Sequence, residues 1–200
     1  MRRIVMFNRV SADGYFAAPN GSLDWVVPEE ELDRAAAANS TGTGTILFGR
    51  RTYDMFESFW PHVVDDSVTA PDPHAAGRRS PEIRAMGQWI NEATKIVFSK
   101  TKKTVTWKNS RVVQELDPRE IESMKSQPGQ DILIFGSGSI VSQLTGHGLI
   151  DEYRFVVGPI LLGNGQSLIS GVLKSTRLEL LEAKSYPAGN VMLRYGCQKR

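Results

Sequence analysis

The chain has 200 residues, of which 40% are hydrophobic and 23% are charged, as in an ordinary globular domain. Its 24 basic and 22 acidic residues leave a net charge of +2, which is too small to favour a nucleic-acid partner. No apolar run approaches the roughly 18 residues of a membrane span, and the N-terminus reads directly as a strand rather than as a signal peptide. These features predict one domain over residues 1–200 and a cytoplasmic location.

Cysteine and histidine offer little chemistry in this sequence. The single cysteine, Cys197, excludes an internal disulfide, and its strand-like surroundings favour a small buried residue over a nucleophile. The histidines show no metal-ligand spacing, and no serine has a visible His/Asp pairing. The sequence therefore predicts no metal site and gives little support to hydrolase chemistry.

Strands and helices are predicted to alternate along the chain. Apolar runs predict strands at 4–10, 45–48, 95–99, 105–107, 131–135, 151–157, 177–185 and 191–197. Prolines and acidic residues predict helix starts, with helices from residue 28 to the glycines at 42 and 44, and at 52–59, 81–91, 118–126 and 139–147. This alternation predicts an α/β sheet of largely parallel order, and the last two strands read as an antiparallel hairpin. Residues 61–80 form an irregular stretch that is either mobile or functional.

The segment 45–54 is the most informative stretch. A short apolar run ends in a glycine, which lets the backbone turn or approach a ligand closely. Two cations and a threonine then stand at a predicted helix start, where free N–H groups and the helix dipole favour an anion. The residues of this turn are Gly49, Arg50, Arg51 and Thr52. Taken alone, they predict either a phosphate-binding turn or a basic turn that faces water.

A second segment, 131–140, repeats this pattern. An apolar strand is followed by Gly136, Ser137 and Gly138 and by a helix predicted to start at Ser139. The backbone there could approach a diphosphate. The full dinucleotide fingerprint is missing, because Val141 stands where the third glycine would be and no acidic residue follows at the expected distance. One such turn is a weak signal, but two in one domain strengthen each other.

The order of these pieces resembles the dihydrofolate reductase fold, and most closely the bacterial family related to the C-terminal reductase domain of riboflavin biosynthesis. The resemblance covers nearly the whole chain. It is carried by the segments Val10–Tyr15, Gly49–Tyr53, Phe135–Ile140, Gly148–Tyr153 and Gly158–Gly165. It implies a three-layer α/β/α domain with a mixed, mostly parallel central sheet and a C-terminal antiparallel hairpin. It also implies a homodimer.

In that family a nicotinamide cofactor lies across the carboxyl ends of the strands, as the general rule for open α/β sheets expects. The resemblance implies that the first turn holds phosphates of NADPH and that the second holds the diphosphate from the other side. Lys100 offers a cation for a 2′-phosphate, whereas Lys102 and Lys103 are better explained as a solvated turn. The residues assigned to the cofactor are Val10, Ser11, Gly49, Arg50, Arg51, Thr52, Ser99, Lys100, Gly136, Ser137, Gly138, Ser139 and Ile140.

Three carboxylates are candidates for the substrate side. In dihydrofolate reductases one carboxylate on the first helix binds the pterin; counting back from Gly49 reaches Asp33, whereas counting forward from Trp25 reaches Glu30. Alternatively, both are acids that serve the helix dipole. Asp13 either contacts substrate or holds its loop as an Asx turn.

Residues 15–25 resemble the mobile lid that closes over the nicotinamide. Within this segment Tyr15 and Trp25 are expected to line an apolar pocket for a flat heterocycle. The lid would exclude water from the reacting groups.

The predicted function is an NADPH-dependent reductase of a small heterocycle, with 5-amino-6-(5-phosphoribosylamino)uracil reductase as the nearest reaction. The alternatives are a dihydrofolate reductase acting on a pterin and a non-catalytic nucleotide-binding module. A phosphorylated substrate would need its own basic site, for which Arg78, Arg79 and Arg84 are candidates. No deaminase zinc motif is present, so a role in riboflavin biosynthesis would be the reductase step alone.

Overall fold

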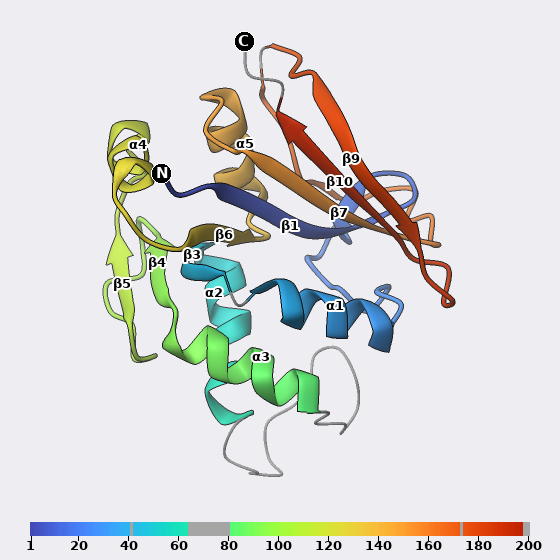
Figure 1. The fold of residues 1–200 in the computed structure, drawn as a ribbon, viewed down its shortest axis with the longest axis horizontal. Coiled ribbons are helices and arrows are strands. Elements are labelled where there is room, and N and C mark those ends of the chain that lie inside the picture. The colour runs from blue at the N-terminus through green and yellow to red at the C-terminus, as the bar shows by residue number, and fades with distance from the viewer. Residues whose placement is uncertain (41, 64–80, 173, 198–200) are drawn as a thin grey trace.

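The computed structural model describes residues 1–40, 42–63, 81–172 and 174–197. An eight-stranded sheet has the order β5-β4-β3-β6-β1-β7-β10-β9, and a small second sheet pairs β2 with β8 (Figure 1). The strands are β1 (Ile4–Ser11), β2 (Tyr15–Ala17), β3 (Thr43–Gly49), β4 (Thr94–Phe98), β5 (Ser110–Val113), β6 (Asp131–Phe135), β7 (Glu152–Gly158), β8 (Gln166–Ser167), β9 (Leu178–Ser185) and β10 (Val191–Cys197).

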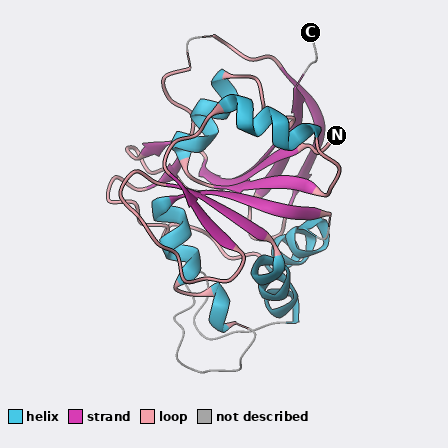
Figure 2. Cartoon of the chain, turned by 90° about the vertical axis from the view of Figure 1, so that its left-hand side faces the viewer, coloured by secondary structure: helices cyan, strands magenta, loops and turns pink. Residues whose placement is uncertain are grey.

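Helices cover both faces of the large sheet. Figure 2 shows the sheet between two helical layers. The helices are α1 (Glu30–Ser40), α2 (Arg50–Glu57), the short 3₁₀ turn η1 (Trp60–His62), α3 (Pro81–Glu92), α4 (Pro118–Ser126) and α5 (Gly138–Gly146). The first three α-helices lie on one face, and α4 and α5 lie on the other. The predicted three-layer α/β/α arrangement is confirmed.

The pairing of the strands is mixed but mostly parallel. β1 runs parallel to both β6 and β7, and β3 runs parallel to both β4 and β6. β10 runs antiparallel to β7 and β9, which makes the last two strands a hairpin. Both the parallel order and the C-terminal hairpin therefore agree with the sequence-based prediction.

Alternation along β1 divides the apolar core between the two faces. Ile4 and Met6 pack with α4 and α5, whereas Val5 and Phe7 pack with α2 and α3. The helix α1 is held separately, because the fully buried Leu32 packs against residues of β7 and of the C-terminal hairpin. Burial of each such side chain contributes about 1.5–3 kcal/mol, so these contacts fix where each helix sits.

The predicted strand at 105–107 is wrong. Trp107 is buried in a loop, where its indole N–H donates to Asn91 Oδ1 at 2.6 Å and its ring lies 5.9 Å from that of Tyr53. The strand begins only at Ser110, after Asn109 adopts a left-handed backbone with φ 58°. The apolar pattern at 105–107 thus reflects a buried side chain that anchors a loop, and not the residues of a hydrogen-bonded strand. Residues 64–80, most of the irregular stretch, lie outside the described residues.

A buried lysine joins α3 to β4. The ammonium of Lys95, which is fully buried, donates to the carbonyls of Ile90, Asn91 and Ala93 at 2.8, 3.1 and 2.8 Å, and lies 4.5 Å from the centre of the Trp107 ring. The last carbonyls of a helix lack intrahelical partners, so this side chain satisfies them. Burial lowers the pKa of Lys95 to about 8.

Within the described part of the chain, no helix combines the length and apolar character that a membrane span requires.

Candidate functional site

A cavity of about 1430 Å³ lies at the carboxyl edge of the parallel strands. It is larger than the roughly 300–1,000 Å³ of a pocket for one small ligand. The walls come from segments that follow β3, β4 and β6, from β1, from the β2 region and from α1 and α3. Because parallel strands bring their carboxyl ends to one edge, the topology gathers these remote segments.

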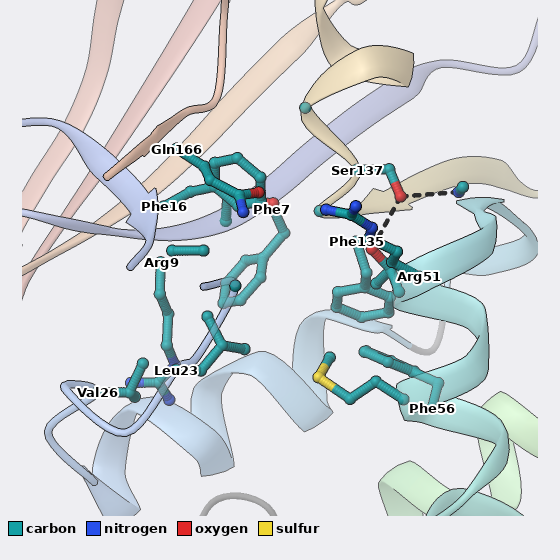
Figure 3. Close-up of a pocket in the computed structure, with 18 of the residues that line it drawn as sticks. Phe7, Arg9, Phe16, Leu23, Val26, Arg51, Phe56, Phe135, Ser137 and Gln166 are labelled. Carbon is teal, nitrogen blue, oxygen red and sulfur yellow. Dashed lines mark hydrogen bonds between the residues drawn. The ribbon is translucent and has the colours of Figure 1, made fainter. Parts of the chain in front are cut away.

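The two glycine turns predicted from the sequence meet in this cavity. Thr52 and Ser137 lie with their hydroxyl groups 2.8 Å apart, and the backbone N–H of Gly49 donates to the Ser137 hydroxyl at 2.8 Å (Figure 3). Gly49 itself has an ordinary φ of −83°. Its lack of a side chain matters for another reason, because a Cβ there would lie 2.6 Å from Ser137 Oγ. Gly49 therefore allows the first turn to approach the second turn closely.

Ser137 adopts a left-handed backbone conformation, with φ 63° and ψ 78°, directly after Gly136 at φ 59°. Such a conformation costs a residue other than glycine on the order of 1–3 kcal/mol and persists where the surroundings enforce it. Here the hydroxyl bonds to the first turn hold it. The turn delivers the chain into α5, whose first residues, Gly138 and Ser139, line the cavity with N–H groups of the kind that a helix start leaves unpaired.

Cations line this end of the cavity. Arg50 forms a weak ion pair with Asp54 at 3.5 Å, and Lys100 forms an exposed one with Glu115 at 3.4 Å. Arg51 points toward the cavity beside Ser137, and within the described residues no carboxylate pairs with it (Figure 3). Helix N-termini and guanidinium groups together form an environment that favours phosphate.

The neighbouring turn after β4 is held by its own contacts. Lys102 was expected to belong to a solvated turn, but its ammonium donates to Asp54 at 2.8 Å and to Glu57 at 3.3 Å, so it is paired rather than freely solvated. The Ser99 hydroxyl accepts the backbone N–H groups of residues 101 and 102. Ser99 therefore lines the cavity while its side chain shapes the turn.

An ion pair marks the opposite end, beside α1. Arg9 of β1 donates from Nη2 to Asp33 Oδ1 at 2.7 Å and from Nη1 to the carbonyl of Val27 at 3.3 Å. Burial lowers the pKa of Arg9, and the contact with Asp33 opposes this shift. Glu30 also lines this end, so the structure brings both candidate carboxylates of α1 into the cavity. Sequence reasoning missed Arg9, although an arginine inside an apolar strand was a visible signal.

Apolar side chains fill the space between the two ends. In Figure 3 Phe7 lies between Arg9 on one side and Arg51 on the other. The expected contributions of Tyr15 and Trp25 are wrong: neither lines the cavity, and the ring of Trp25 lies against Gly158. The large apolar residues that do line it are Phe7, Phe16, Leu23, Val26, Met55, Phe56, Trp60, Ile83, Met86, Phe98 and Phe135.

Asp13 lies outside the cavity lining. Its carboxylate accepts hydrogen bonds from the Ser11 hydroxyl at 2.6 Å and from the N–H groups of Leu162 and Gly163 at 3.1 and 2.7 Å. The hydrogen bond from Ser11 lowers the pKa of Asp13. This geometry favours the loop-holding interpretation over contact with substrate.

The structure divides the residues assigned to the cofactor into two groups. Those that line the cavity are Gly49, Arg50, Arg51, Thr52, Ser99, Lys100, Gly136, Ser137, Gly138 and Ser139. The remaining three, Val10, Ser11 and Ile140, are buried and are not among the lining residues.

The arginines suggested for a substrate phosphate do not add to the described site. Arg84 lies on α3 but outside the cavity lining, and Arg78 and Arg79 lie outside the described residues. Within those residues, histidine, cysteine and acidic side chains form no group of three or more that could hold a metal ion.

Comparison with known proteins identifies the family of this chain. The family profile of the RibD C-terminal domain matches residues 2–192. The chain belongs to the RibD C-terminal domain family. A curated relative, the uncharacterized protein YyaP of Bacillus subtilis, is 25% identical over 194 residues, which cover 97% of this chain and 94% of YyaP.

Solved structures of RibD-like proteins share the fold. A Shewanella sp. PV-4 protein whose name links it to riboflavin biosynthesis superposes with a TM-score of 0.72 at 22% identity, over 100% of both chains. A Thermotoga maritima diaminohydroxyphosphoribosylaminopyrimidine deaminase/5-amino-6-(5-phosphoribosylamino)uracil reductase matches with a TM-score of 0.64 at 14% identity, over 98% of this chain and 57% of its own. The family resemblance and the dihydrofolate reductase-like fold expected from the sequence are thus confirmed.

Proposed function

We propose that the chain is an NADPH-dependent reductase of a small heterocycle, with reduction of a riboflavin-type aminopyrimidine as the nearest reaction. The observation that carries the proposal is the contact between Thr52 and Ser137, which joins two phosphate-type turns at one cavity. Arg50, Arg51 and the start of α5 supply cations and N–H groups suited to a diphosphate. Family membership supports the same interpretation.

The residues present fit a dinucleotide. A Cβ at position 138 would lie 3.1 and 3.2 Å from the carbonyl oxygens of Ser167 and Leu168, so glycine there lets β8 close against the start of α5. The ring of Phe16 would lie 3.2 Å from the same Cβ, so a side chain at this position would crowd the start of α5, which lines the cavity. Lys100, exposed at the rim, would supply the cation for a 2′-phosphate.

NADPH when bound supplies the hydride for the substrate carbon. The protein's own contribution is therefore to bind and orient the cofactor and the substrate, and to exclude water from them. The apolar walls around Phe7 and Phe56 would hold a flat ring away from water. Arg9 holds one carboxylate oxygen of Asp33 at 2.7 Å, and carboxylate oxygens accept hydrogen bonds, so Asp33 suits accepting an N–H from the ring. Reduction also requires one proton at the substrate heteroatom, and solvent at the open rim of the cavity would supply it.

Asp33 also favours a second candidate, a dihydrofolate reductase acting on a pterin. It lies on the first helix and faces the cavity, where that reaction places its carboxylate. A non-catalytic nucleotide-binding module would bind nucleotide phosphates at the cationic end of the cavity but would not turn over a substrate.

The test combines binding with turnover. NADPH titrated into the purified chain should bind with micromolar or tighter affinity, measured by calorimetry. Loss of absorbance of the reduced nicotinamide should then be followed with an aminopyrimidine and with a dihydropterin. Turnover of the first supports the main proposal, and turnover of the second alone supports the pterin candidate. Binding without turnover points to the module, and no binding contradicts all three.

A homodimer forms part of the proposal. β9 is one edge of the sheet, and it exposes Leu180 and Leu181 at 55% and 51%. An edge strand with apolar side chains is a surface that proteins tend to cover. Sedimentation equilibrium should give a dimer mass, and a monomer at tens of micromolar would remove this element of the proposal.

A further inference from the structure

A buried oxygen without a partner lies at the wall of the cavity. Among the described residues, two buried side-chain atoms lack a hydrogen bond, Asn8 Oδ1 and Trp25 Nε1. Trp25 is outside the cavity lining, whereas Asn8 lines the cavity and is only 6% exposed. Buried polar groups nearly always have hydrogen-bond partners, so an unpaired amide oxygen beside a ligand-sized cavity calls for an explanation.

Asn8 is a polar residue at a position where the core is apolar. Side chains alternate along β1, and Asn8 stands between Met6 and Val10, which pack in the apolar core next to α5. An apolar side chain would suit this position in the free protein, because burying an amide oxygen without a hydrogen bond costs stability. The carboxamide is therefore better explained by a partner that the cavity receives.

The register of the sheet places Asn8 beside the second glycine turn. β1 pairs with β6 up to Phe7 and Phe135, so Asn8 is level with Gly136, the first residue of that turn. A Cβ on Gly136 would lie 3.4 Å from Thr52 Oγ1 and 3.7 Å from Asn8 Oδ1. The amide oxygen is thus a near neighbour of the turn assigned to the diphosphate.

The strand order indicates which half of the cofactor reaches this point. Four neighbouring strands run in the order β4-β3-β6-β1. The proposed function puts the diphosphate at the turns that follow β3 and β6, and the 2′-phosphate of the adenosine half at Lys100, after β4. The dinucleotide then continues past β6 to β1, which brings its nicotinamide half to Asn8.

We infer that Asn8 binds the carboxamide of the nicotinamide ring, a conclusion that rests on the proposed function. Both groups carry an acceptor oxygen and a donor nitrogen, so they can pair with each other. A half-turn of the terminal torsion of Asn8 exchanges its oxygen and nitrogen, which lets the side chain match either orientation of the ligand. The contact would fix the rotation of the ring, and with it the direction in which the neighbouring ring carbon presents its hydride.

The experiment compares two cofactors that differ at the amide. The full chain is titrated by calorimetry with NADP⁺ and with its 3-acetylpyridine analogue, in which a methyl group replaces the amide nitrogen. The wild type should bind NADP⁺ about threefold to tenfold more tightly, which is the effect of one neutral hydrogen bond. Adenosine 2′,5′-bisphosphate, which lacks the nicotinamide half, reports on the rest of the site.

Variants at Asn8 locate the effect. Asn8→Leu keeps the branched shape without the polar atoms, and Asn8→Ala removes the carboxamide without adding volume. Both should bind the two cofactors with equal affinity, and both should bind the bisphosphate as the wild type does. Met6→Leu, on the same face of β1 but outside the cavity lining, is the matched control and should keep the preference for NADP⁺. Thermal melting confirms that each variant is folded, and Asn8→Ala carries the test if Asn8→Leu does not fold.

Equal affinity of the wild type for the two cofactors overturns the inference, as does a preference for NADP⁺ that survives in the Asn8 variants. Either result leaves the proposed function standing, because NADP⁺ still binds. Weaker binding of the bisphosphate by the Asn8 variants also overturns the inference, since the effect of the substitutions would then be structural. Absence of NADP⁺ binding to the wild type contradicts the proposed function itself, and the inference with it.

Discussion

Thr52 and Ser137 touch through their hydroxyl groups at 2.8 Å, although 85 positions separate them in the sequence. Each stands in a glycine-bearing turn that closes a parallel strand. The contact places the positive end of α2 and that of α5 at one cavity, so an anion between them would feel both helix dipoles. The proposed reductase depends on this convergence.

Replacing Arg51 with Gln should weaken NADPH binding by roughly tenfold to a hundredfold. A charge-assisted hydrogen bond to phosphate contributes about 1.5–3 kcal/mol, and Gln is both shorter than Arg and uncharged. Calorimetric titration measures the effect. Arg111→Gln, on the remote strand β5, serves as the control and should bind as the wild type does. An Arg51→Gln protein with wild-type affinity would contradict the placement of the phosphates.

The two carboxylates of α1 should differ in their effect on turnover. Asp33 is held in place by Arg9 at 2.7 Å, whereas Glu30 is more exposed. We therefore expect Asp33→Asn to lower kcat/KM by about a hundredfold and Glu30→Gln by less than tenfold, with NADPH affinity unchanged in both. Steady-state kinetics decide between them. A larger loss in Glu30→Gln would reverse the assignment.

Glu152 should make stability depend on acid pH. Its carboxylate is 3% exposed and is paired with Arg3, Arg154 and Arg194 at 3.2, 2.7 and 2.9 Å. Burial alone would raise the pKa of Glu152, but the hydrogen bonds from Arg154 and Arg194 outweigh it and lower the pKa below the ordinary 4.5. A depressed carboxylate pKa stabilises the folded state above the unfolded-state value, and this contribution is lost as the pH falls through the folded-state value.

Urea unfolding of Glu152→Gln measures that contribution. At pH 7 the variant should be less stable than the wild type by about 3 kcal/mol, because it leaves the guanidinium groups without their charge partner. The difference should shrink as the pH falls below about 4.5. A difference that stays constant from pH 7 to pH 3 would show that charge is not its cause.

Lys95→Met should destabilise the fold without touching the cavity. The substitution leaves the carbonyls of Ile90, Asn91 and Ala93 without their buried donor, which we expect to cost about 3 kcal/mol. Lys108→Met, which removes only an exposed ion pair with Glu92, is the matched control and should change stability by less than about 1 kcal/mol. Equal losses in the two variants would contradict the structural role of Lys95.

Elements with local signals were predictable from the sequence. The start of α4 follows from Asp117 and Pro118, since the aspartate accepts the N–H of Arg119 as a helix cap and the proline occupies the first turn. The strands 131–135 and 191–197 also begin and end as predicted. In each of these cases the deciding chemistry lies within a few residues of the boundary.

The remaining site features depend on contacts that the sequence does not display. The two counts toward a carboxylate of α1 disagreed. Within the described part of the chain, the pairing of Asp33 with Arg9 across 24 positions and the greater exposure of Glu30 distinguish the two residues. The side chain of Tyr15 could not be assigned a direction before β2 was known, and Phe16 faces the cavity instead. Trp107 gave a strand-like signal because it is an anchor in a loop.

The absence of a side chain at Gly49 has an evolutionary consequence. Because a methyl group there would collide with the Ser137 hydroxyl, the two positions cannot drift independently. A Cβ at position 49 would also lie 2.9 Å from the Cβ of Ser137, so among orthologues an alanine or larger residue at the first position should occur only together with glycine at the second. Such covariation would show, from sequences alone, that the two turns are in direct contact.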